Sequence, residues 1–282
     1  METIDLHVHS CYSDGSLTPT ELVALALNTG LTAFALTDHD TTDGIDEALQ
    51  AATNTGLEII PGIEFSTRWE HRDVHILGYY VNYHAVSFQK KLHEFLDARD
   101  LRNVKMCERI REYTGFPITL ELLTKAFPDA VITRAHMAAW LVDQGYISSR
   151  PEAFEKYLGE QAPCFVSKTE VTPTNAIQLI LANGGIPVLA HPLLYHLPEE
   201  KMHELIREVK EAGLLGIEAV YVLNQGDDEA YVRSLAEQYH LCITGGSDFH
   251  GKNKPDIALG TGLHGNLSIP YELLTELKKL RP

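Results

Sequence analysis

Seven short apolar runs, many of them rich in β-branched residues, alternate for much of the chain with longer stretches of helical periodicity, a pattern typical of repeated β-α units. The predicted strands are Ile4–Val8, Thr32–Thr37, Leu57–Phe65, Val74–Val81, Ile186–Ala190, Gly216–Val222 and Leu241–Gly245. Consecutive β-α units build a parallel sheet with helices on its outside. The pattern therefore predicts an α/β fold in which seven parallel strands form a barrel.

Helix start and stop signals lie between the predicted strands. A capping threonine, a proline in the first turn and a closing glycine predict a helix from Thr18 to Gly30. The same signals predict a helix from Thr172 to Asn183 and another that begins near Pro270. We interpret these as helices that cross over between strands.

The alternation stops between about residues 85 and 171, where the pattern is helical and the charge density rises. We interpret this stretch as an inserted helical cap subdomain between the fourth and fifth strands. The predicted barrel is then built from residues 1–84 and 172–282. The most natural place for the cap is over the strand ends.

The formal net charge of −16 restricts the partners that the chain can bind. It repels polyanions at long range, which argues against binding of duplex DNA through a broad basic face. Small anions could still bind locally, because divalent cations reverse the sign of the field inside a pocket. No obligate protein partner is evident from the sequence.

The four cysteines are scattered without CxxC spacing, as is usual in a reduced compartment. The N-terminus lacks a charged and then apolar leader, and no apolar run approaches the roughly 18 residues of a membrane span. These observations predict a cytoplasmic protein without a membrane anchor.

Histidines and carboxylates recur at one predicted strand end after another, where parallel barrels build their active sites. They are His7, His9 and Asp14 after the first strand, Asp38, His39 and Asp40 after the second, Glu64 on the third, His75 on the fourth, His191 after the fifth, and Asp248 and His250 after the seventh. Such a coincidence is improbable for buried polar groups without a ligand. The set predicts a shared metal site.

Residue type and spacing narrow the kind of metal site. Positions i and i+2 of a strand face the same side, so His7 and His9 can bind one ion, and Asp248 and His250 can address adjacent ions. Imidazole with carboxylate favours zinc, manganese or iron. A carboxylate such as Glu64 can bridge two ions about 4 Å apart. Asp38 and Asp40 could instead orient the imidazoles.

Six ordered motifs resemble the PHP superfamily, named for polymerase and histidinol phosphatase, and together span nearly the whole chain outside the insertion. They are His7-x-His9 with Ser13-Asp14-Gly15, Thr37-Asp38-His39-Asp40, Gly62-Ile63-Glu64, His75-x-x-Gly78, Ala190-His191-Pro192 and Gly246-Ser247-Asp248-x-His250-Gly251. The resemblance implies a distorted seven-stranded β/α barrel and about three divalent ions, Mn, Fe or Zn.

The resemblance also implies how the ions are shared. His7, His9, Glu64 and Asp248 would surround one ion, Glu64, His75 and His191 a second, and Asp14, His39 and His250 a third. Thr133-Arg134-Ala135-His136 and Pro163-x-x-Val166-x-Lys168 are similar to the branch of nucleoside 3′,5′-bisphosphate phosphatases and 5′-3′ exoribonucleases. That branch commonly has Pro-His where this chain has Ala135-His136, which bears on substrate choice.

We therefore expect a phosphoesterase in which metal-activated water near Glu64 attacks the phosphorus atom. Arg134, His136 and Lys168 are the predicted substrate-binding residues, and Glu64, His136 and Arg134 the predicted catalytic ones. The expected substrate is the 3′-phosphate of a nucleoside 3′,5′-bisphosphate. Alternatives are a 5′-3′ exoribonuclease on short RNA, a histidinol-phosphate phosphatase and a non-catalytic metal-binding module.

Overall fold

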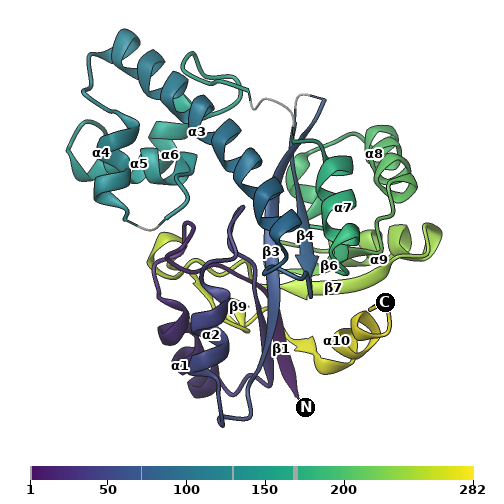
Figure 1. The fold of residues 1–282 in the computed structure, drawn as a ribbon. Helices are drawn as coiled ribbons and strands as arrows, with labels where there is room; N and C mark the ends of the chain where they lie inside the picture. Colours follow the sequence, from purple (N-terminus) through teal and green to yellow (C-terminus); the bar gives the residue numbers. More distant parts are fainter. Residues whose placement is uncertain (1, 71, 129, 168–170) are drawn as a thin grey trace.

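The central sheet of the protein has eight strands and curls until it nearly closes (Figure 1). The computed structural model describes residues 2–70, 72–128, 130–167 and 171–282. The strands, in sheet order, are β10 (Ile269–Pro270), β1 (Thr3–Val8), β2 (Ala33–Leu36), β3 (Glu58–Trp69), β4 (Arg72–Tyr79), β5 (Ile186–Leu189), β6 (Gly216–Tyr221) and β7 (Cys242–Gly246). The predicted α/β barrel is confirmed, and all seven predicted strands are present.

The prediction that all strands run parallel was wrong. Strand β4 is antiparallel to both β3 and β5, and the added strand β10 is antiparallel to β1. Only residues 70 and 71 separate β3 from β4, whereas a parallel pair needs a crossover of a dozen or more residues. The β3–β4 pair is therefore a hairpin, which the strand count alone does not reveal.

The near-closure of the barrel brings β1 next to β7. A parallel bridge joins Val8 to Phe249, and the backbone N–H of His9 donates to the Phe249 carbonyl at 3.0 Å. A Cβ atom on Gly246 would lie 2.1 Å from the Cβ of His7. Glycine at this position thus permits the close approach of the two strands that carry His7 and Asp248.

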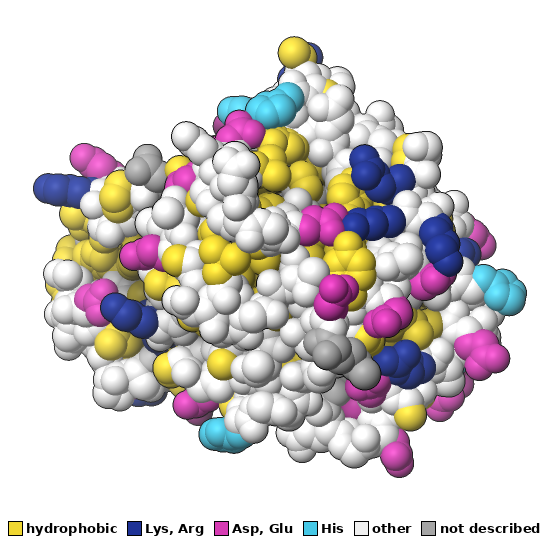
Figure 2. Space-filling view, turned by 90° about the horizontal axis from the view of Figure 1, so that it is seen from below, with side chains coloured by type: hydrophobic (Ala, Val, Ile, Leu, Met, Phe, Trp, Pro, Cys, Tyr) yellow, Lys and Arg dark blue, Asp and Glu magenta, His cyan; other side chains and the backbone are white. Residues whose placement is uncertain are grey.

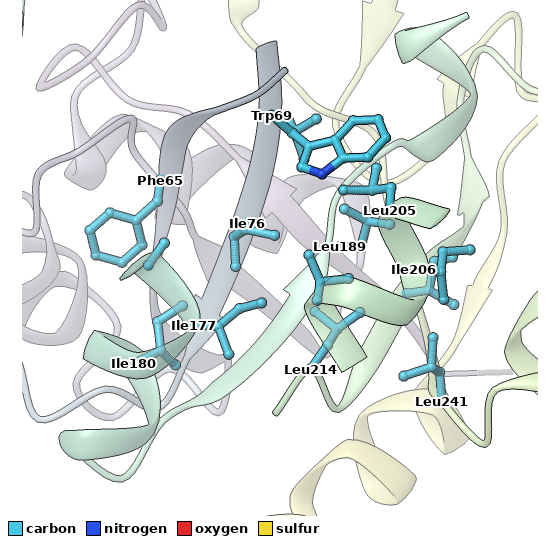
Figure 3. Packing of buried hydrophobic residues seen from close by; sticks show 14 of the residues in the cluster. Phe65, Trp69, Ile76, Ile177, Ile180, Leu189, Leu205, Ile206, Leu214 and Leu241 are labelled. Carbon is cyan, nitrogen blue, oxygen red and sulfur yellow. The ribbon is translucent and has the colours of Figure 1, made fainter. Parts of the chain in front are cut away.

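Helices cover the outside of the barrel and one of its ends. They are α1 (Pro19–Thr29), α2 (Ile45–Ala51), α7 (Pro173–Ala182), α8 (Glu199–Glu211), α9 (Asp228–Gln238) and α10 (Tyr271–Lys278), with short 3₁₀ turns η2 (Pro192–Tyr195) and η3 (Gly251–Asn253) and a small hairpin of β8 (Ile257–Ala258) and β9 (Gly262–Leu263). Figure 3 shows Ile76 and Leu189 of the sheet packed against Ile177 of α7 and Leu205 of α8.

The predicted helix boundaries follow from local capping. Thr18 forms a capping box with Glu21 at the start of α1, and Gly30 ends that helix with φ of 76°. Thr172 caps α7 in the same way through Asn175. The three helices expected from these signals are confirmed.

A helical cap lies over one end of the barrel (Figure 1). It comprises α3 (Val86–Thr114), α4 (Leu120–Ala126), α5 (Arg134–Asp143), α6 (Arg150–Ala153) and the π-helix η1 (Phe154–Leu158). Helix α3 belongs to two cores, because Phe88 and Leu92 pack in the barrel core whereas Met106 and Ile110 pack in the cap core. The division at residues 85 and 171 stays an interpretation.

Charged side chains of both signs are intermixed on the face seen in Figure 2. Lys and Arg residues lie there beside Asp and Glu residues rather than in a continuous basic track. Within the described ranges, no helix has the length and apolarity needed to cross a membrane.

The double role of α3 predicts that its first turn contributes to barrel stability. Phe88 is fully buried, whereas Val86 is 83% exposed on the same turn. We expect Phe88→Ala to lower the free energy of unfolding by about 3–5 kcal/mol, because the change leaves a cavity. Val86→Ala, the matched control, should change it by less than about 0.5 kcal/mol. Urea titration followed by circular dichroism measures both, and equal effects would contradict the packing role.

Candidate active site

The predicted metal ligands gather at the end of the barrel that the cap covers. They come from β1 and the loop after it (His7, His9, Asp14), from the segment after β2 (His39), from β3 (Glu64) and β4 (His75), and from the segments after β5 (His191) and β7 (Asp248, His250). His75 reaches the same place as Glu64 because β4 runs backwards, so that His75 pairs with Ser66 of β3.

Glu64 is the centre of this cluster and is almost fully buried. Its Oε2 atom lies 3.2 Å from His7 Nε2, His9 Nε2 and His39 Nδ1, and its Oε1 atom lies 2.8 Å from His75 Nδ1 and 3.0 Å from His191 Nε2. One carboxylate therefore faces five imidazoles, with both oxygens in use. This is the arrangement expected of a carboxylate that bridges two cations.

Asp14 and Asp248 complete the cluster. Asp14 Oδ1 lies 3.1 Å from His250 Nε2 and 3.9 Å from His39 Nε2. Asp248 Oδ1 lies 3.3 Å from His9 Nε2. The structure thus brings all nine predicted ligands together, in overlapping groups whose donor atoms lie within 4.8 Å of one another: His9–Asp14–His39–His250, His7–His9–Asp248, His7–Glu64–His191 and His39–Glu64–His75.

Several ligand atoms of the cluster are not satisfied by hydrogen bonds within the described part of the protein, as is expected of atoms that bind cations. Among the described residues, His7 Nε2, His9 Nε2 and Asp14 Oδ1 are buried and have no hydrogen-bond partner of acceptable geometry, although charged atoms lie close by. Buried polar atoms without partners are costly. Six imidazoles and three carboxylates that converge in this way are a ligand set for more than one divalent ion.

Burial and the nearby carboxylates shift the pKa values of three histidines in the cluster. Burial would lower the pKa of His7, yet Glu218 and Glu64 beside it raise that pKa well above its ordinary value. For His9, burial would lower the pKa, but the nearby carboxylates of Asp248 and Glu64 raise it to about 9. Burial lowers the pKa of His39 well below its usual range and so keeps that imidazole neutral, as a ligand must be.

Glu218 in β6 is a site residue that the sequence reasoning missed. It is fully buried, its Oε1 atom lies 3.0 Å from His7 Nδ1, and its Oε2 atom accepts the backbone N–H of His191 at 2.8 Å. Glu218 therefore fixes the ring of His7 with Nε2 toward the cluster and holds the backbone of a second ligand. The available signal was an acid within an otherwise apolar strand.

Asp38 and Asp40 position loops, and no imidazole contact of either is found among the described residues. Asp38 accepts hydrogen bonds from Ser10 Oγ at 2.6 Å and from Ser13 Oγ at 2.5 Å. The Ser13 hydroxyl lies 3.4 Å from His9 Nδ1, so Asp38 orients His9 only indirectly. Asp40 pairs with Arg99 of α3 and accepts the backbone N–H of Ser66.

Three residues at the site have left-handed backbones. Asp40, His191 and Asp248 follow strands β2, β5 and β7, and their φ angles are 53°, 23° and 52°. This region is unfavourable for residues other than glycine by about 1–3 kcal/mol, and such conformations cluster at functional sites. This backbone conformation places His191 and Asp248 in the cluster and Asp40 against Arg99.

Two predicted substrate-binding residues of α5 point in different directions. Arg134 donates to Asp73 Oδ2 at 2.5 Å and lines a cavity beside the cluster. His136 Nδ1 accepts the backbone N–H of Thr133 at 3.0 Å. His136 lines a different cavity together with Ser13 and Asp14. Acid catalysis by His136 stays a prediction. Lys168 lies outside the described residues.

The cavity next to Arg134 is rich in arginine. It has a volume of about 130 Å³ and is lined by Arg99, Arg102 and Arg134 and by the potential ligands Asp14, His39 and His75. Arg99 and Arg102 are 6% and 4% exposed. Burial lowers the pKa of Arg99 to about 9 and that of Arg102 to about 10, so both remain cations at neutral pH. The sequence reasoning missed both, because arginines on a helix are usually solvated.

A larger cavity of about 530 Å³ opens over the cluster itself. It shares Asp14, His39 and His75 with the arginine-rich cavity and extends to Arg150 and Phe154 of the cap. Buried ligands for several cations beside a cavity of this size define the site of a metal-dependent hydrolase.

Comparison with known proteins identifies the class more closely. The family model of the PHP domain matches residues 5–211. The chain belongs to the PHP domain family and is a metal-dependent phosphoesterase, as the motifs predicted.

Relatives of similar length carry related names. The chain is similar to a 5′-3′ exoribonuclease of Haemophilus influenzae, with 38% identity over 87% of this chain and 89% of the relative. It is also similar to a 3′,5′-nucleoside bisphosphate phosphatase of Chromobacterium violaceum, with 33% identity over 89% and 88%. A solved structure of an amidohydrolase from Chromobacterium violaceum, with bound sulfate, has a TM-score of 0.86 and 31% identity over 99% of this chain and 96% of that chain.

The contacts of Glu218 predict a role in metal affinity. Glu218→Gln keeps the shape of the side chain but removes the charge that orients His7. We expect the affinity for Mn²⁺ to fall about 10–100-fold, measured by equilibrium dialysis with metal analysis. Glu237→Gln, an exposed change on α9, is the matched control. Equal affinities in the two variants would show that Glu218 does not support the metal site.

Proposed function

We propose that this phosphoesterase removes the 3′-phosphate of nucleoside 3′,5′-bisphosphates. The observation that carries the proposal is the arginine-rich cavity, which shares a wall with the ligand cluster. A substrate with phosphates on the 3′ and 5′ oxygens of one ribose can place one phosphate among the arginines and the other at the cluster. The bisphosphatase named among the relatives supports this choice.

The ligand cluster supplies the hydrolytic chemistry. We propose His7, His9, Asp14, His39, Glu64, His75, His191, Asp248 and His250 as metal ligands. Bound divalent ions supply a nucleophilic water at neutral pH and neutralise the charge of the phosphate. Glu64 lies at the centre of the cluster, so it would hold the ions beside which the attacking water is activated. The bond that breaks joins phosphorus to the ribose 3′-oxygen, which takes up a proton.

The arginines would bind and orient the second phosphate. Arg102 makes no ion pair within the described part of the chain, and its buried Nε atom has no hydrogen-bond partner there. A planar guanidinium binds phosphate oxygens in bidentate fashion. Arg134 stacks near Phe154, with its guanidinium carbon 5.8 Å from the ring centre. We propose that these groups hold the 5′-phosphate, with Lys168 as a further predicted contact.

A 5′-3′ exoribonuclease is the second candidate. It would use the same two subsites, with the 5′-phosphate of the RNA among the arginines and the first internal phosphodiester at the cluster. The extension of the larger cavity beyond the cluster favours it, because an RNA needs room after the scissile bond. The exoribonuclease name of a relative supports it as well.

A substrate panel tests the proposed function directly. In the presence of Mn²⁺, we expect kcat/KM to be highest for adenosine 3′,5′-bisphosphate, compared with histidinol phosphate and 3′-AMP. A chelator should abolish the activity and added Mn²⁺ should restore it, because the cluster has no other source of activated water. A higher value for histidinol phosphate would contradict the proposal.

The arginine-rich cavity predicts which residue sets the preference for two phosphates. Arg102→Met removes charge-assisted hydrogen bonds worth about 1.5–3 kcal/mol. We expect the ratio of kcat/KM for adenosine 3′,5′-bisphosphate to that for 3′-AMP to fall about 10–100-fold. Arg207→Met, an exposed change on α8, should keep the wild-type ratio. An unchanged ratio in Arg102→Met would remove the arginines from the proposed binding site.

A further inference from the structure

We propose that Arg150, at the start of α6, binds the phosphodiester that follows the scissile bond, and so lets the site accept short oligonucleotides in addition to bisphosphates. The inference rests on the proposed function and adds a third anion-binding position to it. Arg150 lines the larger cavity over the ligand cluster, whereas Arg99 and Arg102 line the arginine-rich cavity.

The first observation is the unsatisfied charge of Arg150. Its guanidinium donates to Asn253 Oδ1 at 2.9 Å and to the Asn253 carbonyl at 3.4 Å. A guanidinium has five N–H donors, so these bonds leave several unused. In the described ranges no carboxylate forms an ion pair with Arg150, whereas Arg99 pairs with Asp40 and Arg134 pairs with Asp73. A partly buried cation without a carboxylate partner is suited to an anionic ligand.

The second observation is that Asn253 ties Arg150 to the catalytic end of the barrel. Asn253 lies in η3, and its Nδ2 donates to the backbone carbonyl of Asp14 at 2.7 Å. The side chain of Asn253 thus fixes the position of the cap residue Arg150 relative to the proposed metal ligand Asp14. Figure 1 shows the segment after β7 beneath the cap helices, as this contact requires.

The third observation is the course of the cavities. The arginine-rich cavity and the larger cavity share Asp14, His39, His75, Ala135 and Phe154. From this common wall the first extends to Arg99 and Arg102, and the second continues past Asp248 to Arg150, Asn253 and Lys254. A third cavity of about 300 Å³ is also lined by Arg150 and Asn253.

Lys254 adds positive charge to this exit. Its Nζ atom lies 2.6 Å from Asp248 Oδ2, and its side chain remains 39% exposed at the cavity wall. A mononucleotide bisphosphate needs only the arginine-rich cavity and the cluster. Arg150, which has no carboxylate partner among the described residues, is therefore explained by a chain that continues after the scissile phosphate.

The test compares two substrates in one enzyme. We would measure kcat/KM with Mn²⁺ for adenosine 3′,5′-bisphosphate and for a 5′-phosphorylated RNA trinucleotide. In Arg150→Met, we expect the ratio of the trinucleotide value to the bisphosphate value to fall at least about tenfold, since a charge-assisted contact to phosphate is lost. Arg150→Lys should restore part of the ratio. Lys252→Met, an exposed change in η3, is the matched control and should keep the wild-type ratio.

The outcomes separate the two proposals. A loss of both activities by the same factor in Arg150→Met, with Arg150→Lys equally impaired, would mean that the residue only supports the fold, and would overturn the inference. Wild-type hydrolysis of the bisphosphate without any cleavage of the trinucleotide would also overturn it, while the proposed function stands. Failure of the wild type on both substrates would overturn the proposed function itself.

Discussion

The rest of the structure depends on the burial of one carboxylate, Glu64, among five imidazoles. A buried charge must be compensated, and here the compensation comes from residues of β1, β4 and the segments after β2 and β5. The curvature of the sheet, the close approach of β1 and β7 at Gly246 and the reversed direction of β4 all bring these side chains to one point. The barrel therefore holds the imidazoles in place around the Glu64 carboxylate.

The ligand cluster was predictable because its residues follow a simple rule. Polar side chains at the ends of apolar strands meet at one edge of the sheet, and this holds for His7, His191 and Asp248 without knowledge of the fold. Direction was not predictable from strand composition, since β4 looks like its neighbours. The predicted strands that correspond to β3 and β4 left only residues 66–73 between them, and the structure leaves only residues 70 and 71, which is too short for a parallel crossover.

Residues that support the ligands were harder to find. Glu218 lies within β6, where its neighbours suggest ordinary core packing. Arg99 and Arg102 look like solvated charges on a helix, and only tertiary contacts bury them. The cap residues Arg134 and His136 were given related roles by resemblance, yet they face different cavities because helix positions i and i+2 point about 160° apart.

Helix α3 is one uninterrupted rod that begins in the barrel core at Phe88 and ends in the cap core at Ile110, with Arg99 and Arg102 between them. No hinge separates the arginines from the residues that fix the helix to the barrel. The spacing between the cluster and the arginines is thus set by one continuous helix. In the proposed function, this fixed spacing would select substrates by the distance between their two phosphates.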